Sequence, residues 1–286
     1  MHNRSIGGRT VSAIGLGAMP MSIEGRPDRA RATATVHAAL DEGITLIDTA
    51  DAYHREAGEV GHNESLIAEA LAAAGPAADG VLVATKGGHL RPGDGTWTLD
   101  GRPEYLKRAC EASLRRLGVE AIGLYQFHRP DPGVDYAESV GALAELLDEG
   151  KILMAGISNA DPGEIRTAHK VLGGRLASVQ NQFSPKFRSS EPELRLCEEL
   201  GVAFLPWSPL GGIREAADLG SHYSAFAAVA EDRGVSPQRV CLAWMLAKSP
   251  VVVPIPGSSR PETVHDSALG ADLRLSEEEI ARLDRA

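Results

Sequence analysis

Three consecutive apolar segments of the sequence each lead to a polar residue that could take part in proton transfer. These residues are Asp48, Lys86 and His128, and Tyr53 follows Asp48 on an expected loop. A tyrosine with an ordinary pKa is a poor proton donor at neutral pH, but a neighbouring ammonium group stabilises the phenolate and lowers that pKa. An aspartate can hold the lysine charged, and a histidine can donate a hydrogen bond to a substrate oxygen. Together these groups could protonate a carbonyl oxygen while a hydride reaches the carbonyl carbon.

Each of these residues also has a structural explanation when it is taken alone. An aspartate that closes a strand most often forms a turn or caps a helix. Lys86 could be a solvated strand end, His128 a loop histidine and Tyr53 a rim aromatic. A shared catalytic role requires that the three strand ends lie side by side, and this depends on the fold.

Short apolar segments alternate with segments of helical periodicity along the whole chain. The expected strands are 13–19, 44–48, 81–85, 122–128, 152–157, 177–181, 203–207 and 251–255. The expected helices are 29–42, 64–74, 103–117, 136–149, 161–172, 191–200 and 237–247, with an added helix at 223–231. Continuously apolar strands joined by amphipathic helices indicate a parallel sheet covered by helices.

Eight such units favour a closed (β/α)8 barrel, the TIM barrel, over an open sheet, because a closed barrel has no exposed edge. The 286 residues suit a single barrel domain, residues 1–286, with an N-terminal extension and long loops at the C-terminal face. The irregular segments that follow strands would form that rim; they are 54–61, 87–102, 129–135, 184–190 and 211–222.

Composition excludes several classes of protein. The 39 acidic and 29 basic residues give a net charge of −10, which argues against binding to nucleic acid or to anionic membranes. No segment approaches the length of a membrane span, and the start of the chain has no apolar signal region. The three cysteines are far apart, so neither disulfides nor a cysteine metal site is indicated. These features favour a cytoplasmic protein.

Beyond these patterns, the chain resembles the aldo-keto reductases from end to end. The similar stretches are IGLGAM at 14–19, EGITLIDTADAY at 42–53, GHNESLIAEAL at 61–71, VATKGG at 83–88, SLRRLGVEAIGLYQFH at 113–128, GKILMAGISN at 150–159, SVQNQFS at 178–184, PWSPLGG at 206–212 and PIPGSS at 254–259. The resemblance implies a (β/α)8 barrel that uses NAD(P)H. It places the catalytic tetrad of that family on Asp48, Tyr53, Lys86 and His128, with Tyr53 as general acid.

The resemblance also implies a set of cofactor-binding residues. Ser158, Asn159 and Gln180 match groups that hold the nicotinamide carboxamide, and Trp207 replaces the tyrosine more usual beneath the ring. The remaining candidates are Gly17, Met19, Ser208, Pro209, Leu210, Gly211, Gly212, Gly257, Ser258, Ser259, Arg260 and Asp266. The segment Gly15-Leu16-Gly17 is not a GxGxxG fingerprint, because proline stands at its third glycine position.

We expect NADPH to be preferred, with NADH left open. Arg260, neighbouring hydroxyls and the start of the expected helix at Pro261 suit a phosphate dianion. The chain departs from the family at Thr263, where a basic residue is common, and at Asp266-Ser267, where Glu-Asn is common.

Two residues are expected to contact substrate. His54 opens an unusually long and charged loop after Tyr53, and Trp97 stands in the loop after the third strand, as a pocket wall or a rim anchor. His54, His62 and His89 do not have the spacing of metal ligands, so no metal is expected.

The favoured function is reversible reduction of an aldehyde or ketone, with a small-molecule substrate and a monomer or weak homo-oligomer. Three alternatives stay open. They are physiological oxidation of an alcohol, pyridoxine or sugar; a cofactor-sensing regulatory subunit with little turnover; and a Schiff-base aldolase that uses Lys86. The rim loops determine which substrate binds, and sequence patterns predict the structure of loops less well than that of helices and strands.

Overall fold

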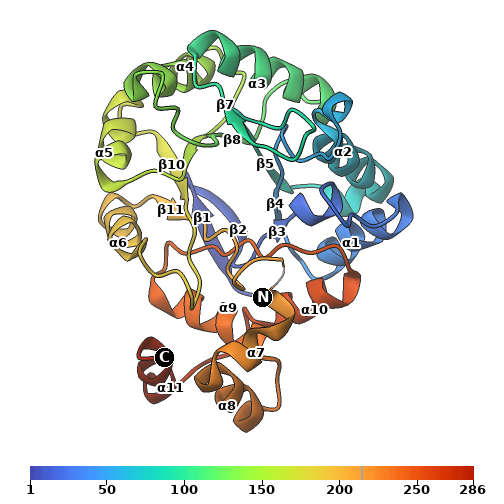
Figure 1. The fold of residues 1–286 in the computed structure, drawn as a ribbon, viewed down its shortest axis with the longest axis vertical. Helices are drawn as coiled ribbons and strands as arrows, with labels where there is room; N and C mark the ends of the chain where they lie inside the picture. The colour runs from blue at the N-terminus through green and yellow to red at the C-terminus, as the bar shows by residue number, and fades with distance from the viewer. Residues whose placement is uncertain (214) are drawn as a thin grey trace.

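Seven parallel strands form the central sheet of the protein. The computed structural model describes residues 1–213 and 215–286, and Figure 1 shows the helices arranged as a ring around the sheet. In spatial order the strands are β11 (Ala203–Phe204), β10 (Leu176–Gln180), β9 (Ala155–Ser158), β8 (Leu124–Phe127), β5 (Leu82–Gly87), β4 (Leu46–Asp48) and β3 (Leu16–Gly17). Each pair of neighbours is parallel. The sheet confirms the predicted α/β class.

The eighth predicted strand, 251–255, closes the ring without forming a regular strand. On one side the Val253 N–H donates to the Phe204 carbonyl at 2.9 Å, and on the other the Gly17 N–H donates to the Pro256 carbonyl at 3.0 Å. Pro256, like the proline two positions earlier, has no N–H with which to continue the ladder. The prediction of a strand was therefore wrong in local detail, but the prediction of a (β/α)8 barrel is confirmed.

Helices surround the barrel in the order predicted. They are α1 (Arg29–Asp41), α2 (His62–Ala74), α3 (Pro103–Leu117), α4 (Tyr136–Asp148), α5 (Pro162–Val171), α6 (Glu191–Leu200), α9 (Pro237–Lys248) and α10 (Pro261–Leu269). The added helix is α8 (Ser224–Arg233), and the chain ends in α11 (Glu277–Asp284). In α3, Leu106 and Cys110 are fully buried against the sheet, as the 3.6-residue period of apolar positions requires.

A hairpin at the N-terminus was not predicted. β1 (Asn3–Ile6) and β2 (Arg9–Ser12) pair antiparallel and cross the middle of the ring in Figure 1. Ile6 and Val11 are buried in the same cluster as Leu46 and Leu82 of the barrel strands. The predicted first strand, 13–19, is correspondingly wrong in extent, because β3 covers only Leu16–Gly17.

Two of the predicted rim loops contain further structure. Segment 87–102 folds into an antiparallel hairpin of β6 (His89–Leu90) and β7 (Thr98–Leu99). Segment 211–222 contains the short helix α7 (Leu219–His222), and its residue 214 lies outside the described residues. Within residues 1–213 and 215–286, no helix has the length and apolar character that a membrane crossing requires.

Candidate active site

Lys86 lies at the centre of a buried hydrogen-bond network at the C-terminal end of the barrel. Its Nζ donates to Asp48 Oδ1 at 2.5 Å, to the Thr49 carbonyl at 2.8 Å and to the hydroxyl of Tyr53 at 3.0 Å. β4 ends at Asp48 and β5 carries Lys86 near its end, so parallel pairing of the two strands sets the ion pair. The Lys86 side chain has no exposed surface, which removes competing water from these bonds.

Two glutamines hold the other oxygen of the Asp48 carboxylate. Gln180 Nε2, on β10, donates to Asp48 Oδ2 at 2.7 Å, and Gln126 Nε2, on β8, approaches the same oxygen at 3.4 Å. The carboxylate is therefore fixed from three strands. The role of Gln126 was missed, because a polar residue inside an apolar strand gave no indication of where its side chain points.

Burial and charge act in opposite directions on Lys86 and Tyr53. Burial alone would lower the pKa of Lys86, but Asp48 and Tyr53 outweigh it and raise that pKa above its usual value. Burial raises the pKa of Tyr53, and the opposing effect of Lys86 does not cancel it. The predicted lowering effect of Lys86 is present, but burial outweighs it. Tyr53 therefore holds its proton at neutral pH and is poised as a donor.

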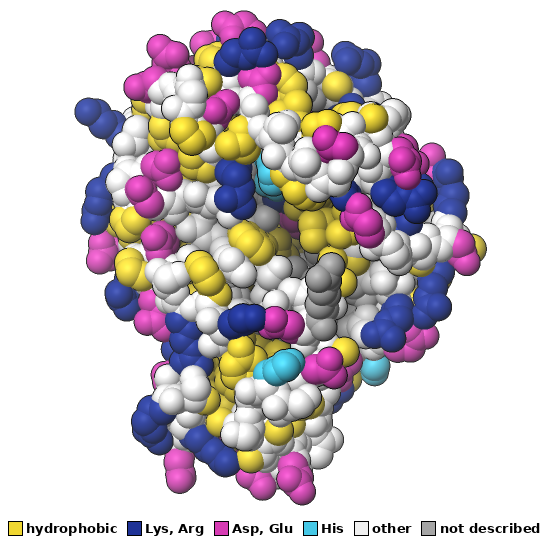
Figure 2. Space-filling model, viewed as in Figure 1, with side chains coloured by type: hydrophobic (Ala, Val, Ile, Leu, Met, Phe, Trp, Pro, Cys, Tyr) yellow, Lys and Arg dark blue, Asp and Glu magenta, His cyan; other side chains and the backbone are white. Residues whose placement is uncertain are grey.

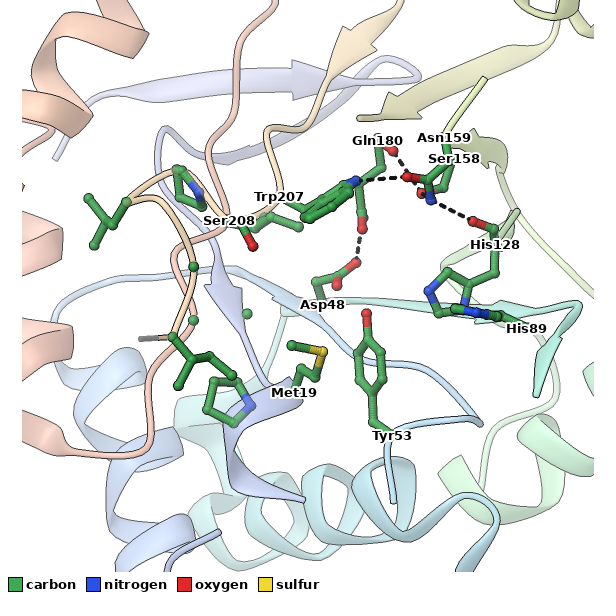
Figure 3. A pocket seen from close by; sticks show the side chains of 18 of the residues that line it. Met19, Asp48, Tyr53, His89, His128, Ser158, Asn159, Gln180, Trp207 and Ser208 are labelled. Carbon is green, nitrogen blue, oxygen red and sulfur yellow. Dashed lines mark hydrogen bonds between the residues drawn. The ribbon is translucent and has the colours of Figure 1, made fainter. Parts of the chain in front are cut away.

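His128 stands beside Tyr53 as a neutral imidazole. The His128 and Tyr53 rings meet edge to face, with their centroids 5.7 Å apart, and Figure 3 shows the two side chains pointing into the same space. Burial, followed by the charge of Lys86, holds the pKa of His128 well below its usual value. A neutral imidazole can donate one N–H to a substrate oxygen without placing a second cation beside Lys86.

A cavity of about 550 Å³ opens above these residues. Figure 2 shows it as a hollow near the middle of the face at the C-terminal ends of the strands. The residues that line it, in chain order, are Gly17, Met19, Pro20, Asp48, Tyr53, His89, Trp97, His128, Arg129, Ser158, Asn159, Gln180, Trp207, Ser208, Pro209, Leu210, Gly212, Ile213, Ala216, Ile255 and Gly257. Catalytic, cofactor and substrate candidates thus share one cavity.

Comparison with known proteins identifies the architecture. Residues 13–286 match the model of the Aldo/keto reductase family. The chain belongs to this family. It is 34% identical over 283 residues to an uncharacterised oxidoreductase of Schizosaccharomyces pombe, covering 98% of this chain and 88% of the relative.

Solved structures give the same result. A glycerol dehydrogenase of Gluconobacter oxydans superposes with a TM-score of 0.83 at 29% identity, covering 99% of this chain and 94% of that chain. An aldo-keto reductase of Klebsiella pneumoniae, solved in complex with NADPH, superposes with a TM-score of 0.82 at 28% identity, covering 100% and 95%.

In this aldo-keto reductase the polar residues expected at the nicotinamide form a connected group. Trp207 Nε1 donates to Asn159 Oδ1 at 3.2 Å, and Asn159 Nδ2 donates to the His128 carbonyl at 3.0 Å (Figure 3). The Ser158 hydroxyl donates to the Gln180 carbonyl at 2.7 Å. Asn159 and Ser208 adopt positive φ angles of 58° and 49°, a strained conformation that is often retained at functional sites.

Several predicted cofactor residues lie outside the cavity lining. They are Gly211, Ser258, Ser259, Arg260 and Asp266. Ser258 and Arg260 precede α10, where the Ser258 hydroxyl accepts from the Arg260 N–H at 3.1 Å. The Asp266 carboxylate is already held by Arg239 at 2.7 Å and by the Ser236 hydroxyl, so it links α10 to α9. Its place among the cofactor-binding residues stays a prediction.

His54 was predicted to contact substrate, but the structure does not bring it to the cavity. Its side chain is fully buried, and its Nδ1 bonds the Glu56 carbonyl at 2.8 Å beneath the loop. His89 and Arg129 line the cavity instead, and both were missed. Their sequence positions, just after the strands that carry Lys86 and His128, were the available signal.

The described part of the chain contains no cluster of three or more His, Cys, Asp or Glu side chains arranged as metal ligands.

Proposed function

We propose that this protein is an NADPH-dependent oxidoreductase that reversibly reduces an aldehyde or ketone to the alcohol. One observation carries the proposal: the Lys86 ammonium bonds both the Asp48 carboxylate and the Tyr53 hydroxyl at the wall of the cavity. This arrangement holds a proton donor at the place where negative charge would develop on a carbonyl oxygen.

Each residue then has a separable part in proton transfer. A bound nicotinamide cofactor supplies or accepts the hydride. Tyr53 gives its proton to the carbonyl oxygen, and Lys86 stabilises the phenolate that remains. Asp48 keeps Lys86 charged and oriented, while neutral His128 donates a hydrogen bond that orients the carbonyl.

The residues present fit a nicotinamide cofactor. We assign the binding of the nicotinamide carboxamide to Ser158, Asn159 and Gln180. The Nε2 of Gln180 already donates to Asp48, so its amide oxygen is left as an acceptor. Trp207 offers an aromatic surface for the ring. Gly212 has a φ of 105°, and Gly211 before it also lies at positive φ, so backbone N–H groups can approach phosphate oxygens there. The NADPH complex of the Klebsiella pneumoniae relative supports the use of a nicotinamide cofactor.

The preference for NADPH over NADH rests on Arg260 and the start of α10. Arg260 is exposed, and α10 begins at the next residue, so a phosphate group there would meet both a guanidinium and free helix N–H groups.

The direction of the reaction in the cell is a separate matter, since one transition state serves both directions. The Gluconobacter oxydans relative is named a glycerol dehydrogenase, which favours oxidation of an alcohol as the second candidate.

A fluorescence titration with NADPH and NADH, followed by a panel of aldehydes, ketones and pyridoxal, tests the proposal. We expect tighter binding of NADPH and its consumption with at least one carbonyl compound, with formation of the matching alcohol. Tight NADPH binding without turnover of any compound in either direction would contradict the proposal and favour a cofactor-sensing role. Covalent trapping of a substrate on Lys86 by borohydride, without cofactor, would favour an aldolase.

A further inference from the structure

Arg129 places a positive charge at the cavity beside the tetrad. It follows His128 directly, is half-buried and lines the cavity. Burial lowers the pKa of Arg129, and the charge of Arg129 helps to lower the pKa values of His89 and His128. Because Arg129 is adjacent to His128 in the chain and both line the cavity, it lies at the tetrad end of the cavity. Figure 2 shows basic and histidine side chains bordering the hollow.

No acidic side chain of residues 1–213 or 215–286 forms an ion pair with Arg129. The nearest candidate in sequence, Asp131, uses its two oxygens on the backbone N–H groups of Gly101 at 2.9 Å and Gly133 at 2.8 Å. Partial burial of an unpaired guanidinium costs free energy, because water is removed from the charge without a replacement partner.

The rest of the described cavity wall leaves this charge uncompensated. Asp48 is the one acidic residue of that lining, and its carboxylate is already engaged by Lys86 and Gln180. Burial lowers the pKa of His89 to about 4, so it is neutral with His128 at physiological pH. Among the described residues that line the cavity, Arg129 is therefore the cationic partner available to an entering anion.

The part of the cavity wall beside Tyr53 and His128 is aromatic. The rings of His89 and Trp97 stack with their centroids 4.5 Å apart, and the ring of His89 meets that of His128 edge to face with a centroid distance of 4.9 Å. The guanidinium carbon of Arg91 lies 5.1 Å from the centroid of the Trp97 ring, and this contact holds the Trp97 ring in place. An aromatic wall of this kind suits a short or aromatic spacer.

We propose that the substrate is a carbonyl compound with a carboxylate on a short or aromatic spacer, and that Arg129 binds the carboxylate while the carbonyl meets Tyr53 and His128. This inference rests on the proposed function, since it names the substrate class of the same site. A guanidinium matches a carboxylate with two parallel hydrogen bonds, which fixes the orientation of the substrate as well as binding it.

Matched substrates test the proposal on the wild-type protein. The probes are 3- and 4-carboxybenzaldehyde and the corresponding carbamoylbenzaldehydes, which keep the shape but are neutral. For at least one of the carboxybenzaldehydes, the wild-type kcat/KM should exceed that of the matching amide by about tenfold or more. About tenfold is a typical lower bound for a desolvated charge pair. The preference should shrink as salt is added, because added ions screen the attraction.

Variants then assign the preference to one residue. In Arg129→Met the ratio of kcat/KM for carboxylate over amide should fall at least about tenfold, and Arg129→Lys should retain part of it, because lysine keeps the charge but loses the paired geometry. The matched control is Arg115→Met on the exposed side of α3, which removes the same charge far from the cavity and should leave the ratio unchanged.

The outcomes separate this inference from the proposed function. Turnover of the amides with no wild-type preference for the carboxylates would overturn the inference and leave the reductase intact. An unchanged ratio in Arg129→Met, accompanied by weaker NADPH binding in titration, would also overturn it and would assign Arg129 to a cofactor phosphate. Failure of every aldehyde, charged or neutral, would count against the proposed function itself.

Discussion

Replacement of Tyr53 with phenylalanine should lower kcat for carbonyl reduction by about 10²–10⁴-fold, the usual contribution of a positioned general acid. The substitution removes only the hydroxyl that bonds Lys86 at 3.0 Å and faces the cavity. NADPH binding should persist, because the residues assigned to the cofactor remain. Single-turnover kinetics and a fluorescence titration with NADPH measure the two effects separately.

The pH dependence of the wild type supplies a second check on Tyr53. A general acid must be protonated, so the rate of reduction should be maintained below its pKa and fall above it. Burial raises the pKa of Tyr53 above its usual value near 10, so the fall should appear only in strongly alkaline solution.

The matched control for this variant is Tyr136→Phe. Tyr136 packs against Phe127 outside the cavity, and its buried hydroxyl has no hydrogen-bond partner among the described residues. This control should keep near wild-type activity. Near wild-type reduction by Tyr53→Phe would remove Tyr53 from the mechanism.

Replacement of Lys86 with methionine should harm both activity and stability. Without the ammonium group, the phenolate formed on Tyr53 loses its stabilising charge, so the rate of reduction should fall at least as far as in Tyr53→Phe. The buried Asp48 carboxylate would also lose its cation, a change that costs about 3–5 kcal/mol of unfolding free energy in typical buried pairs. Denaturant unfolding and turnover assays measure the two losses.

Lys170→Met is the control for charge removal. Lys170 is exposed on α5, so its replacement should change unfolding free energy by no more than about 0.5 kcal/mol. If Lys86→Met were as stable and as active as this control, the buried ion pair would have neither the structural nor the chemical role assigned to it.

Much of the barrel could be predicted because its elements follow simple periodicities. Apolar strands end at Asp48 and Lys86, and the helix from Pro103 to Leu117 has an apolar face of period 3.6, so both kinds of element were visible. If neighbouring strands are parallel, their polar ends must lie side by side. This assumption was enough to predict that Asp48, Lys86, Tyr53 and His128 come together.

The errors occurred where tertiary contacts overrode local pattern. Residues 251–255 look like a strand, yet prolines interrupt the ladder that closes the barrel. His54 looked like a pocket residue because it follows Tyr53, but the short 3-10 helix η2 (Ala57–Glu59) folds the loop over it.

Arg129 and His89 are cavity residues that the sequence did not predict. Neither stood out in the sequence, because a basic residue and a histidine in rim loops are usually solvated. Only the folded arrangement, with the β6–β7 hairpin against the end of β8, shows that both line the cavity. The substrate end of the site was thus the part that the sequence described least.

Transfer of deuterium to a carbonyl compound from NADPH that carries deuterium at both C4 positions is a direct test of hydride transfer at this site. We expect mass spectrometry to find one deuterium on the carbon of the product alcohol, in amounts matching the NADPH consumed. We also expect Tyr53→Phe to bind the labelled cofactor but to produce the labelled alcohol at a greatly reduced rate. Alcohol without the label, or no alcohol from any carbonyl compound while NADPH stays tightly bound, would contradict the account.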